Sequence, residues 1–485
     1  MASTPPRIRK DVYKLAATDK TLEWYGRAIT EMKKRPLKDP TSWRYQAAIH
    51  GYVRSQDPYA KSGESMPSSS EQTKFWNQCQ HGSWYFLSWH RGYLLYFERI
   101  CLRAIVALGG PKDWALPYWN YSSTGTPNTK LIPPAFRKST LSGGGANPLY
   151  VPGRNPNAES TGDVGIDPAD VSLNCLTRTQ FVGSSDGGSP GFGGPQTGFH
   201  HGSGVLGACE ATPHNNIHGA VGGFMGSFNQ AGLDPLFWLH HCNIDRIWEI
   251  WRRRTTSSGD PTSSAWRDFL FNIHNESGGA ITFKSSQMSS TTANGYKYQD
   301  VTDPLAGSGS SALASVTEGA MPSEPSDSGP RRPAELAGAS QAAIPLGTGR
   351  SSARVAIAPE ARSVLASVGD TEAKRVFLNI ENITGRGPPG TYKVYVNVPD
   401  GEDPESHQDH FVGTLPLFGI GEQSEDDAAH GGSGLTLVLE ITGLVNRLQG
   451  EGTWNEFDLD VDFVPLRPVP EGADVKIGRL SVYHA

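Results

Sequence analysis

The chain has 485 residues, of which 19% are charged and 37% hydrophobic, and its formal net charge is -6. This length allows two or three domains. No apolar run approaches the roughly 18–20 residues that cross a membrane, and no basic run is interleaved with aromatic residues, so we expect neither a membrane nor a nucleic acid as partner. The first residues lack the apolar core of a secretory signal, and we expect a cytoplasmic protein unless it is exported with a carrier.

The helical signals lie in two stretches of the first half. Apolar residues recur at helical spacing in residues 21–35 and again in 89–110, where the pattern stops at Gly109-Gly110. Residues 138–208 are dense in Gly, Ser, Pro and Asn, which favours loops. Helical spacing returns in 214–254. The sequence therefore predicts a mainly α-helical domain with long loops over residues 1–300.

The C-terminal part has a different pattern. Residues 301–340 contain no aromatic residue and are rich in Ala, Gly, Ser and Pro, which predicts a linker. From residue 341 onward, apolar and polar residues alternate in several short runs, which are 353–359, 375–383, 392–399, 435–441 and 456–464. Short alternating runs separated by turn residues predict an all-β domain over 341–485, a sandwich or a barrel.

The cysteines do not indicate a disulfide framework. There are five, an odd number, and they are widely spaced with no CxxC pair: Cys79, Cys101, Cys175, Cys209 and Cys242. Neither a structural zinc site nor a redox pair is therefore expected from them.

The histidines are the most informative residues. His214 and His218 are four residues apart, so on a helix both rings lie on one face. A single such pair is weak evidence, but five more histidines lie in apolar helical surroundings: His50, His81, His90, His240 and His241. Two groups of three, one from each half of a helical bundle, would bind a pair of metal ions. Imidazole suits copper, zinc, nickel and iron; no carboxylate joins either group and HExxH is absent, so copper is preferred.

At this point the motifs resemble a known family. "HGSWYFLSWHRGYLLYFER" (81–99) and "PHNNIHG" with "DPLFWLHHCNIDRIW" (213–219 and 234–248) resemble the two copper motifs of the tyrosinase and polyphenol oxidase family. The resemblance implies a four-helix bundle around a type 3 dicopper centre, followed by a C-terminal β domain. It implies two copper ions per chain, dioxygen as co-substrate and small phenolic substrates. It leaves open whether chains form a homo-oligomer.

Carried over by motif position, the resemblance gives each metal its ligands. His50, His81 and His90 would bind the first copper, and His214, His218 and His241 the second, with His240 as a neighbour. It also implies a thioether bond between Cys79 and His81. The alternative for Cys79 is an ordinary buried thiol.

Other positions match residues that act on the substrate in the family. Glu210 and Asn215 match residues that hold a catalytic water, and Phe228 matches a gate residue above the copper, with core packing as its alternative. In several members the β domain covers the site and inserts an apolar residue; the candidates here are Leu415, Leu417 and Phe418, with strand packing as the alternative for each of them. The motif "GYKYQ", with Tyr296 and Tyr298, resembles the family's closing tyrosine motif, whose arginine partner is Arg7 or Arg9.

The resemblance implies a tyrosinase that hydroxylates monophenols in the ortho position and oxidises o-diphenols to o-quinones. Phe228 is bulky, as in members that mainly oxidise catechols, whereas Glu210 and Asn215 favour hydroxylation. A catechol oxidase or an o-aminophenol oxidase is therefore the alternative. An oxygen carrier of the haemocyanin type and a zinc-loaded structural protein are more remote interpretations.

Overall fold

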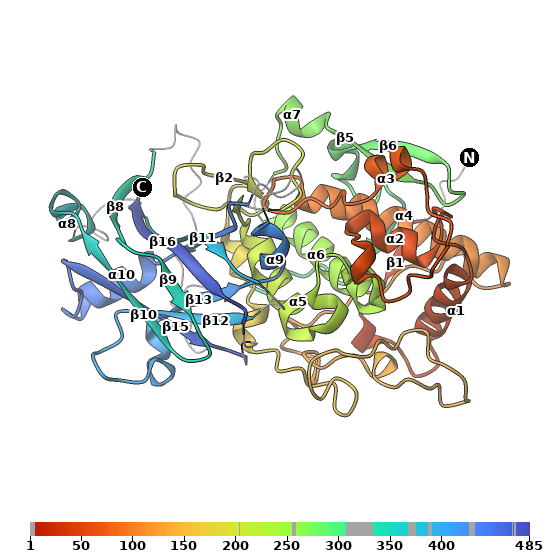
Figure 1. Ribbon diagram of the computed structural model, residues 1–485, viewed down its shortest axis with the longest axis horizontal. Coiled ribbons are helices and arrows are strands. Elements are labelled where there is room, and N and C mark those ends of the chain that lie inside the picture. The colour runs from red at the N-terminus through yellow and green to blue at the C-terminus, as the bar shows by residue number, and fades with distance from the viewer. Residues whose placement is uncertain are drawn as a thin grey trace.

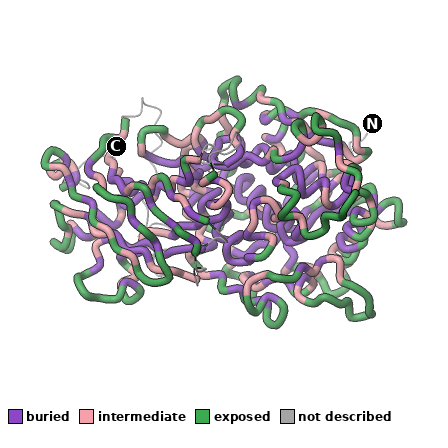
Figure 2. The backbone as a smooth tube through the Cα atoms, viewed as in Figure 1, coloured by how far each residue is buried: buried purple, intermediate pink, exposed green. Residues whose placement is uncertain are grey.

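The computed structural model describes residues 5–202, 204–254, 259–306, 333–366, 375–386, 390–425, 432–467, 469 and 472–485. Figure 1 shows two bodies side by side, one built around helices and one around a twisted sheet. The interior of the helical body is buried almost throughout (Figure 2). Within the described residues, no helix is both long enough and apolar enough to cross a bilayer. The predicted combination of an α domain and a β domain is confirmed.

The helical body contains seven α-helices within the described residues. They are α1 (Thr21–Lys33), α2 (Trp43–His50), α3 (Ser69–Phe75), α4 (Phe86–Ala107), α5 (Asn216–Val221), α6 (Pro235–Arg254) and α7 (Ser264–Arg267). The stretches 21–35 and 89–110 are helical as predicted. The stretch 214–254 is interrupted: α5 ends at Val221, and Gly222 and Gly223 adopt positive φ angles that break the helix.

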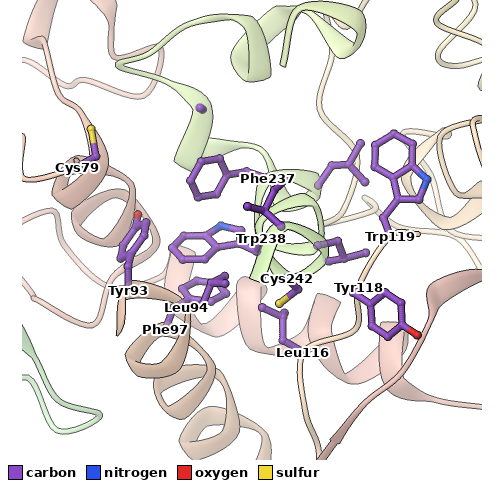
Figure 3. Close-up of a cluster of buried hydrophobic side chains, with 14 of the residues drawn as sticks. Cys79, Tyr93, Leu94, Phe97, Leu116, Tyr118, Trp119, Phe237, Trp238 and Cys242 are labelled. Atoms are coloured by element: carbon purple, nitrogen blue, oxygen red, sulfur yellow. The ribbon is translucent and has the colours of Figure 1, made fainter. Parts of the chain in front are cut away.

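Helices α4 and α6 form the centre of this body. Their faces meet through aromatic rings: Trp238 of α6 stacks on Phe97 of α4 with centroids 3.3 Å apart and also contacts Tyr93 (Figure 3). The N-terminus of α6 is fixed by Asp234, whose carboxylate accepts the Leu236 N–H at 2.8 Å. Large flat rings in close contact hold the two helices at a defined distance.

The first and last strands of the helical body pair with each other. Strand β1 (Arg7–Arg9) pairs in parallel with β7 (Tyr296–Tyr298), and β5 (Leu270–His274) forms a hairpin with β6 (Ala280–Lys284). Arg9 is fully buried; it donates to Glu98 at 2.8 Å and to the Tyr298 hydroxyl at 2.9 Å, and its guanidinium lies 3.8 Å from the Tyr296 ring centroid. Asp245 accepts hydrogen bonds from both tyrosines and from Arg9. Of the two predicted arginine partners, Arg9 is thus the one that contacts both tyrosines.

The long segment predicted as loops contains only short elements. Besides 3₁₀ turns it has β2 (Val182–Gly183) pairing with β3 (Gly194–Pro195), and β4 (Gly204–Val205). Strand β4 pairs in parallel with β14 (Leu435–Glu440) of the C-terminal sheet, so this loop region joins the two bodies.

The described part of the C-terminal body is one hydrogen-bonded sheet with three short α-helices. Its strands follow the order β13, β12, β15, β10, β8, β16, β11, β14, β4, and β9 also pairs with β16. The new bounds are β8 (Glu335–Ala339), β9 (Ile344–Leu346), β10 (Ser351–Ile357), β11 (Val376–Thr384), β12 (Thr391–Val396), β13 (Phe411–Pro416), β15 (Asp458–Pro465) and β16 (Val475–His484), with α8 (Pro359–Ala366), α9 (Ile420–Gln423) and α10 (Thr442–Gly450). All five predicted alternating runs are strands.

The sheet curls but does not close. A Cβ built on Gly413 of β13 would lie 2.9 Å from Leu439 of β14, so strands near opposite ends of the sheet approach each other. No backbone ladder joins them in the described part of the chain, so the domain is an open, barrel-like sheet and not a closed barrel.

The predicted domain boundary needs one correction. Strand β8 lies inside the range predicted as a linker, yet it pairs with β10 and β16. Its sequence, Glu-Leu-Ala-Gly-Ala, has too few large apolar residues to show the alternation of a strand, and only pairing with two neighbours makes it one. The sheet domain therefore begins before residue 341. Residues 307–332 of the predicted linker lie outside the described residues.

Candidate metal centre

Seven buried histidines meet between the helices. Helices, one helical turn and one loop supply them: His50 ends α2, His81 lies in the loop before α4, His90 lies in the second turn of α4, His214 lies in the helical turn Glu210–Asn215 that leads into α5, His218 lies on α5, and His240 and His241 lie on α6. Their side chains are almost completely shielded from solvent. The structure thus brings all six predicted ligands into one place.

The first group consists of His50, His81 and His90. Their ring centroids lie 5.2–5.7 Å apart, although 40 residues separate the first from the last. His50 Nδ1 donates to the Phe228 carbonyl at 3.1 Å, and His90 Nδ1 donates to the Phe86 carbonyl at 2.8 Å. Backbone acceptors therefore fix both rings so that Nε2 faces the centre of the group.

The second group is built on the HxxxH pair. The rings of His214 and His218 lie 4.6 Å apart, and His241 lies 4.9 Å from His214 and 5.6 Å from His218. His218 Nδ1 donates to the Met225 carbonyl at 2.6 Å. His214 Nδ1 donates to the Asn215 side-chain oxygen at 2.7 Å. Both rings are thereby oriented in the same manner as in the first group.

The two groups face each other. His90 and His241 stack with centroids 4.5 Å apart and planes 10° apart, and His81 lies 5.7 Å from His214. Two ions bound by these groups would therefore be neighbours, as the sequence predicted.

The donor atoms fit metal ions. In the described residues, the Nε2 atoms of all six predicted ligands are buried without a hydrogen-bond partner, and so is that of His240. Buried polar atoms are normally paired, so this convergence of unpaired nitrogens is typical of a metal site. Burial lowers the pKa of every one of these imidazoles well below its usual range, because the charged form is desolvated, and the rings are therefore neutral ligands. Neutral nitrogen donors without a carboxylate suit copper.

His240 is a seventh imidazole close to the second group. Its donor atoms lie within 4.8 Å of those of His214, His218 and His241. Its Nδ1 lies 3.1 Å from the Tyr121 hydroxyl, and its ring contacts no histidine of the first group among the described contacts. His241, in contrast, contacts rings of both groups. This central position favours His241 as the ligand.

Cys79 lies beside the first group. Its buried thiol is within 4.8 Å of donor atoms of His50 and His81, and both nitrogens of His81 lack a hydrogen-bond partner in the described residues. All five cysteines are free thiols and are buried, so no disulfide is formed. The proximity of Cys79 to His81 is compatible with the predicted thioether.

His201 was missed by sequence reasoning. Its Nδ1 lies 2.8 Å from the Cys79 carbonyl and 3.1 Å from the Cys79 sulfur, and its ring contacts Phe228. It comes from the glycine-rich segment that the sequence marked only as loop. The His200-His201 doublet was the available signal, but no helical pattern surrounds it.

Glu210 and Asn215 flank the second group. Both carboxylate oxygens of Glu210 accept the Gly82 N–H at 3.0 Å, next to His81. Burial raises the pKa of Glu210 to about 8, since the backbone donors offset only part of the desolvation. Asn215 orients His214, a contact that the sequence did not predict.

Two phenylalanines cover the histidines. Phe228 lies 4.7 Å from the ring of His81 and 5.4 Å from that of His50. Phe418, from the segment between β13 and α9 of the sheet domain, stacks on His218 at 3.9 Å and lies 5.7 Å from Phe228. Of the three predicted plug candidates, Leu415 and Leu417 pack in the core of the sheet domain, and only Phe418 joins the core around the histidines.

A cleft of about 1290 Å³ runs between the two bodies beside this cover. Residues of both bodies line it, among them Tyr52, His201, Gly419, Glu422 and Lys476. None of the six predicted ligands lines it, and neither does Phe228 or Phe418, although their chain neighbours Ser227 and Gly419 do.

Comparisons with known proteins agree with this geometry. Residues 40–254 match the model of the common central domain of tyrosinase, and residues 333–485 match a family described only as a domain of unknown function. The chain is 35% identical to tyrosinase HcTyr1 of Hahella sp. (strain CCB-MM4), over 98% of this chain and 99% of that protein. The chain belongs to the tyrosinase family. It is therefore a copper oxidoreductase of the tyrosinase and polyphenol oxidase type, with two copper ions per chain and small phenolic substrates.

Other relatives place the two bodies in context. A chloroplastic polyphenol oxidase of Malus domestica is 30% identical, but the match covers 58% of this chain and 46% of that protein. The solved structure of a latent apple tyrosinase shares the fold over 100% of this chain and 98% of its own, with a TM-score of 0.61 at 24% identity. The arrangement of a helical body and a covering sheet domain therefore occurs in that structure too.

Proposed function

We propose that this enzyme hydroxylates monophenols in the ortho position and oxidises the resulting o-diphenols to o-quinones, and that Phe418 keeps it latent. The observation that carries the proposal is the convergence of six orphaned Nε2 atoms in two facing groups. His50, His81 and His90 would hold one copper ion, and His214, His218 and His241 the other. When bound, the copper pair would activate dioxygen and take up the electrons that the phenol releases.

The position of Phe418 indicates where a phenol ring would bind. Its ring lies flat on His218, with planes 16° apart, and Phe228 closes the other side. A flat aromatic slot of this kind would accept a phenol ring by the same stacking, once Phe418 leaves. The adjoining cleft would give the phenol a path to it.

Glu210 would handle the phenol proton. A general base works best when its pKa is near the working pH, and the pKa of about 8 for Glu210 meets that condition. Because its oxygens are engaged by Gly82, the proton would pass through a water molecule and not by direct contact with the phenol. Asn215, which accepts a hydrogen bond from His214, would keep that ring at a fixed position relative to the water.

Catechol oxidation alone is the second candidate function. The observation in its favour is Phe228, whose bulky ring covers His81 and His50. A ring at this place restricts how far a monophenol can turn its ortho carbon toward the metals, whereas a catechol has only to present its hydroxyls.

The test compares tyramine with dopamine on the copper-loaded enzyme. We expect quinone from both, and we expect Glu210→Gln to lower turnover of tyramine by at least about 100-fold more than that of dopamine, the lower end of the 10²–10⁴-fold range of general-base effects. Glu451→Gln, an exposed acid in the sheet domain, is the matched control. Quinone from dopamine alone would refute hydroxylation and establish the second candidate.

A further inference from the structure

A cluster of side chains of the types that bind metals lies in the sheet domain, far along the chain from the copper ligands. It belongs to residues 397–410, which connect β12 to β13 through two 3₁₀ turns. His407, Asp409 and His410 each offer a donor atom there, and these atoms all lie within 4.8 Å of one another. The two imidazole rings are 5.7 Å apart. Nothing in the phenol chemistry uses these residues.

His410 is held as a metal ligand would be. Its side chain is nine-tenths buried, and its Nδ1 donates to the Val396 carbonyl at 2.8 Å. This hydrogen bond orients the ring so that Nε2 is the atom left for a metal, and proteins orient metal-binding imidazoles in this way. The Nε2 atom lies 3.7 Å from an Asp409 carboxylate oxygen, too far for a hydrogen bond but within the span of two ligands of one ion.

His407 supplies the second imidazole of the cluster, from its solvent-facing side. Its Nε2 is hydrogen-bonded to the carboxylate of Glu402, five residues earlier. The side chain of Glu402 is 54% exposed and that of Asp409 55%, so both carboxylates can turn without disturbing the core. The loop thus offers two imidazole nitrogens and up to two carboxylate oxygens.

We propose that His407, Asp409 and His410 form a third metal site, with Glu402 within reach as a fourth ligand. The class of ion follows from the donors: two imidazoles with carboxylates suit Zn²⁺ or Cu²⁺, whereas Mg²⁺ and Ca²⁺ prefer oxygen ligands alone. Around a tetrahedral ion with bonds of about 2.0–2.1 Å, neighbouring donors lie about 3.4 Å apart, so closing the present spacing requires only side-chain rotation.

The site lies at the start of the strand that leads to the plug. His410 directly precedes β13, which ends two residues before Phe418. An ion at this loop would bind the folded sheet domain and not the unfolded chain, so it would raise the melting temperature of the protein.

The experiment uses the full chain loaded with two copper ions. It is dialysed against zinc sulfate, and in parallel against copper sulfate, then desalted and analysed for both metals. We expect one zinc ion per chain beside two copper ions, or a third copper ion in the parallel sample. His407→Gln and Asp409→Asn each should weaken this binding at least tenfold while the two original copper ions stay bound.

His484→Gln is the matched control, because His484 lies in the same domain with Glu335 as its acidic neighbour at 3.9 Å. His407 and Asp409 are partly exposed, so their variants are expected to fold even if a substitution at His410 does not. Binding of copper without zinc assigns the site to copper. The absence of any third ion, or equal binding by His407→Gln and His484→Gln, would overturn the proposal.

Discussion

The ring of Phe418 lies flat against the imidazole of His218, with centroids 3.9 Å apart and planes at 16°. One residue belongs to the sheet domain and the other to the metal centre of the helical body, 200 residues earlier in the chain. The contact therefore couples access to the metal centre to the docking of the sheet domain.

Phe418→Ala is expected to increase kcat/KM for dopamine and tyramine by about tenfold or more, a change equivalent to about 1.4 kcal/mol in the barrier. The reason is that the variant no longer has to displace a ring from the substrate slot. Steady-state assays of the copper-loaded variant check this. Phe457→Ala is the control, because Phe457 is exposed in the same domain and should leave the rate unchanged. A variant that binds two copper ions but is no faster would contradict the role of Phe418 as a plug.

His240 and His241 can be distinguished by metal content. We expect His241→Ala to retain one copper ion per chain and to lose all oxidase activity, because a copper ion cannot stay bound by two imidazoles against a chelator. His240→Ala should retain two, since the ring of His240 contacts only histidines of the second group and does not lie between the two groups as His241 does. Elemental analysis after dialysis against a weak chelator measures this. One copper ion in the His240 variant and two in the His241 variant would reverse the assignment.

A thioether between Cys79 and His81 stays a prediction, and it would be a covalent change that mass spectrometry detects. Bond formation removes the thiol hydrogen and one ring hydrogen, and two electrons pass to dioxygen, which becomes hydrogen peroxide. The peptide that contains both residues should therefore be lighter by two hydrogen atoms after copper loading in air, and one of the five thiols should no longer react with a thiol reagent in denaturant. Cys101→Ser should leave this result unchanged. An unaltered peptide from active enzyme would show that Cys79 is an ordinary buried thiol.

The copper-free protein is expected to lose stability as the pH falls. The pKa of each buried ligand histidine is lowered well below 6.5, so below about pH 6.5 the unfolded chain binds protons that the folded chain does not. Each such histidine contributes up to about 1.4 kcal/mol per pH unit. Glu210 has the opposite effect. Its pKa is raised to about 8 in the folded chain, so between about pH 5 and pH 8 the folded chain holds one proton there that the unfolded chain does not.

Urea denaturation of chelator-treated protein at about pH 7 and about pH 5.5 measures the difference. We expect the free energy of unfolding to fall by several kcal/mol, which corresponds to a net uptake of several protons on unfolding. A slope of one proton or less would mean that the histidines are accessible to protons in the folded state. Copper binding should raise the free energy of unfolding at pH 7, since the neutral rings are then free to act as ligands.

Much of the fold could be read from local patterns. The period of the apolar residues predicted helices at 21–35 and 89–110 and five of the strands, because these elements bury one face and their side-chain spacing reflects it. The pattern failed at β8, which consists mainly of small residues, and at residues 222–234, where glycines break a stretch with helical spacing. At β8 the pairing partners decide the structure. At Gly222 and Gly223 the positive φ angles, which glycine adopts without strain, end the helix.

The sequence by itself determined the chemistry: the number and type of donor residues, their order along the chain and the family to which they belong. Only the tertiary structure decided which of Leu415, Leu417 and Phe418 reaches the histidines, which of Arg7 and Arg9 meets the two tyrosines, and that His201 and Asn215 touch Cys79 and His214. The reason is physical. Ligand type and helical spacing are local properties of the chain, whereas a stacking contact or a side-chain hydrogen bond between distant segments depends on how separately formed elements pack together.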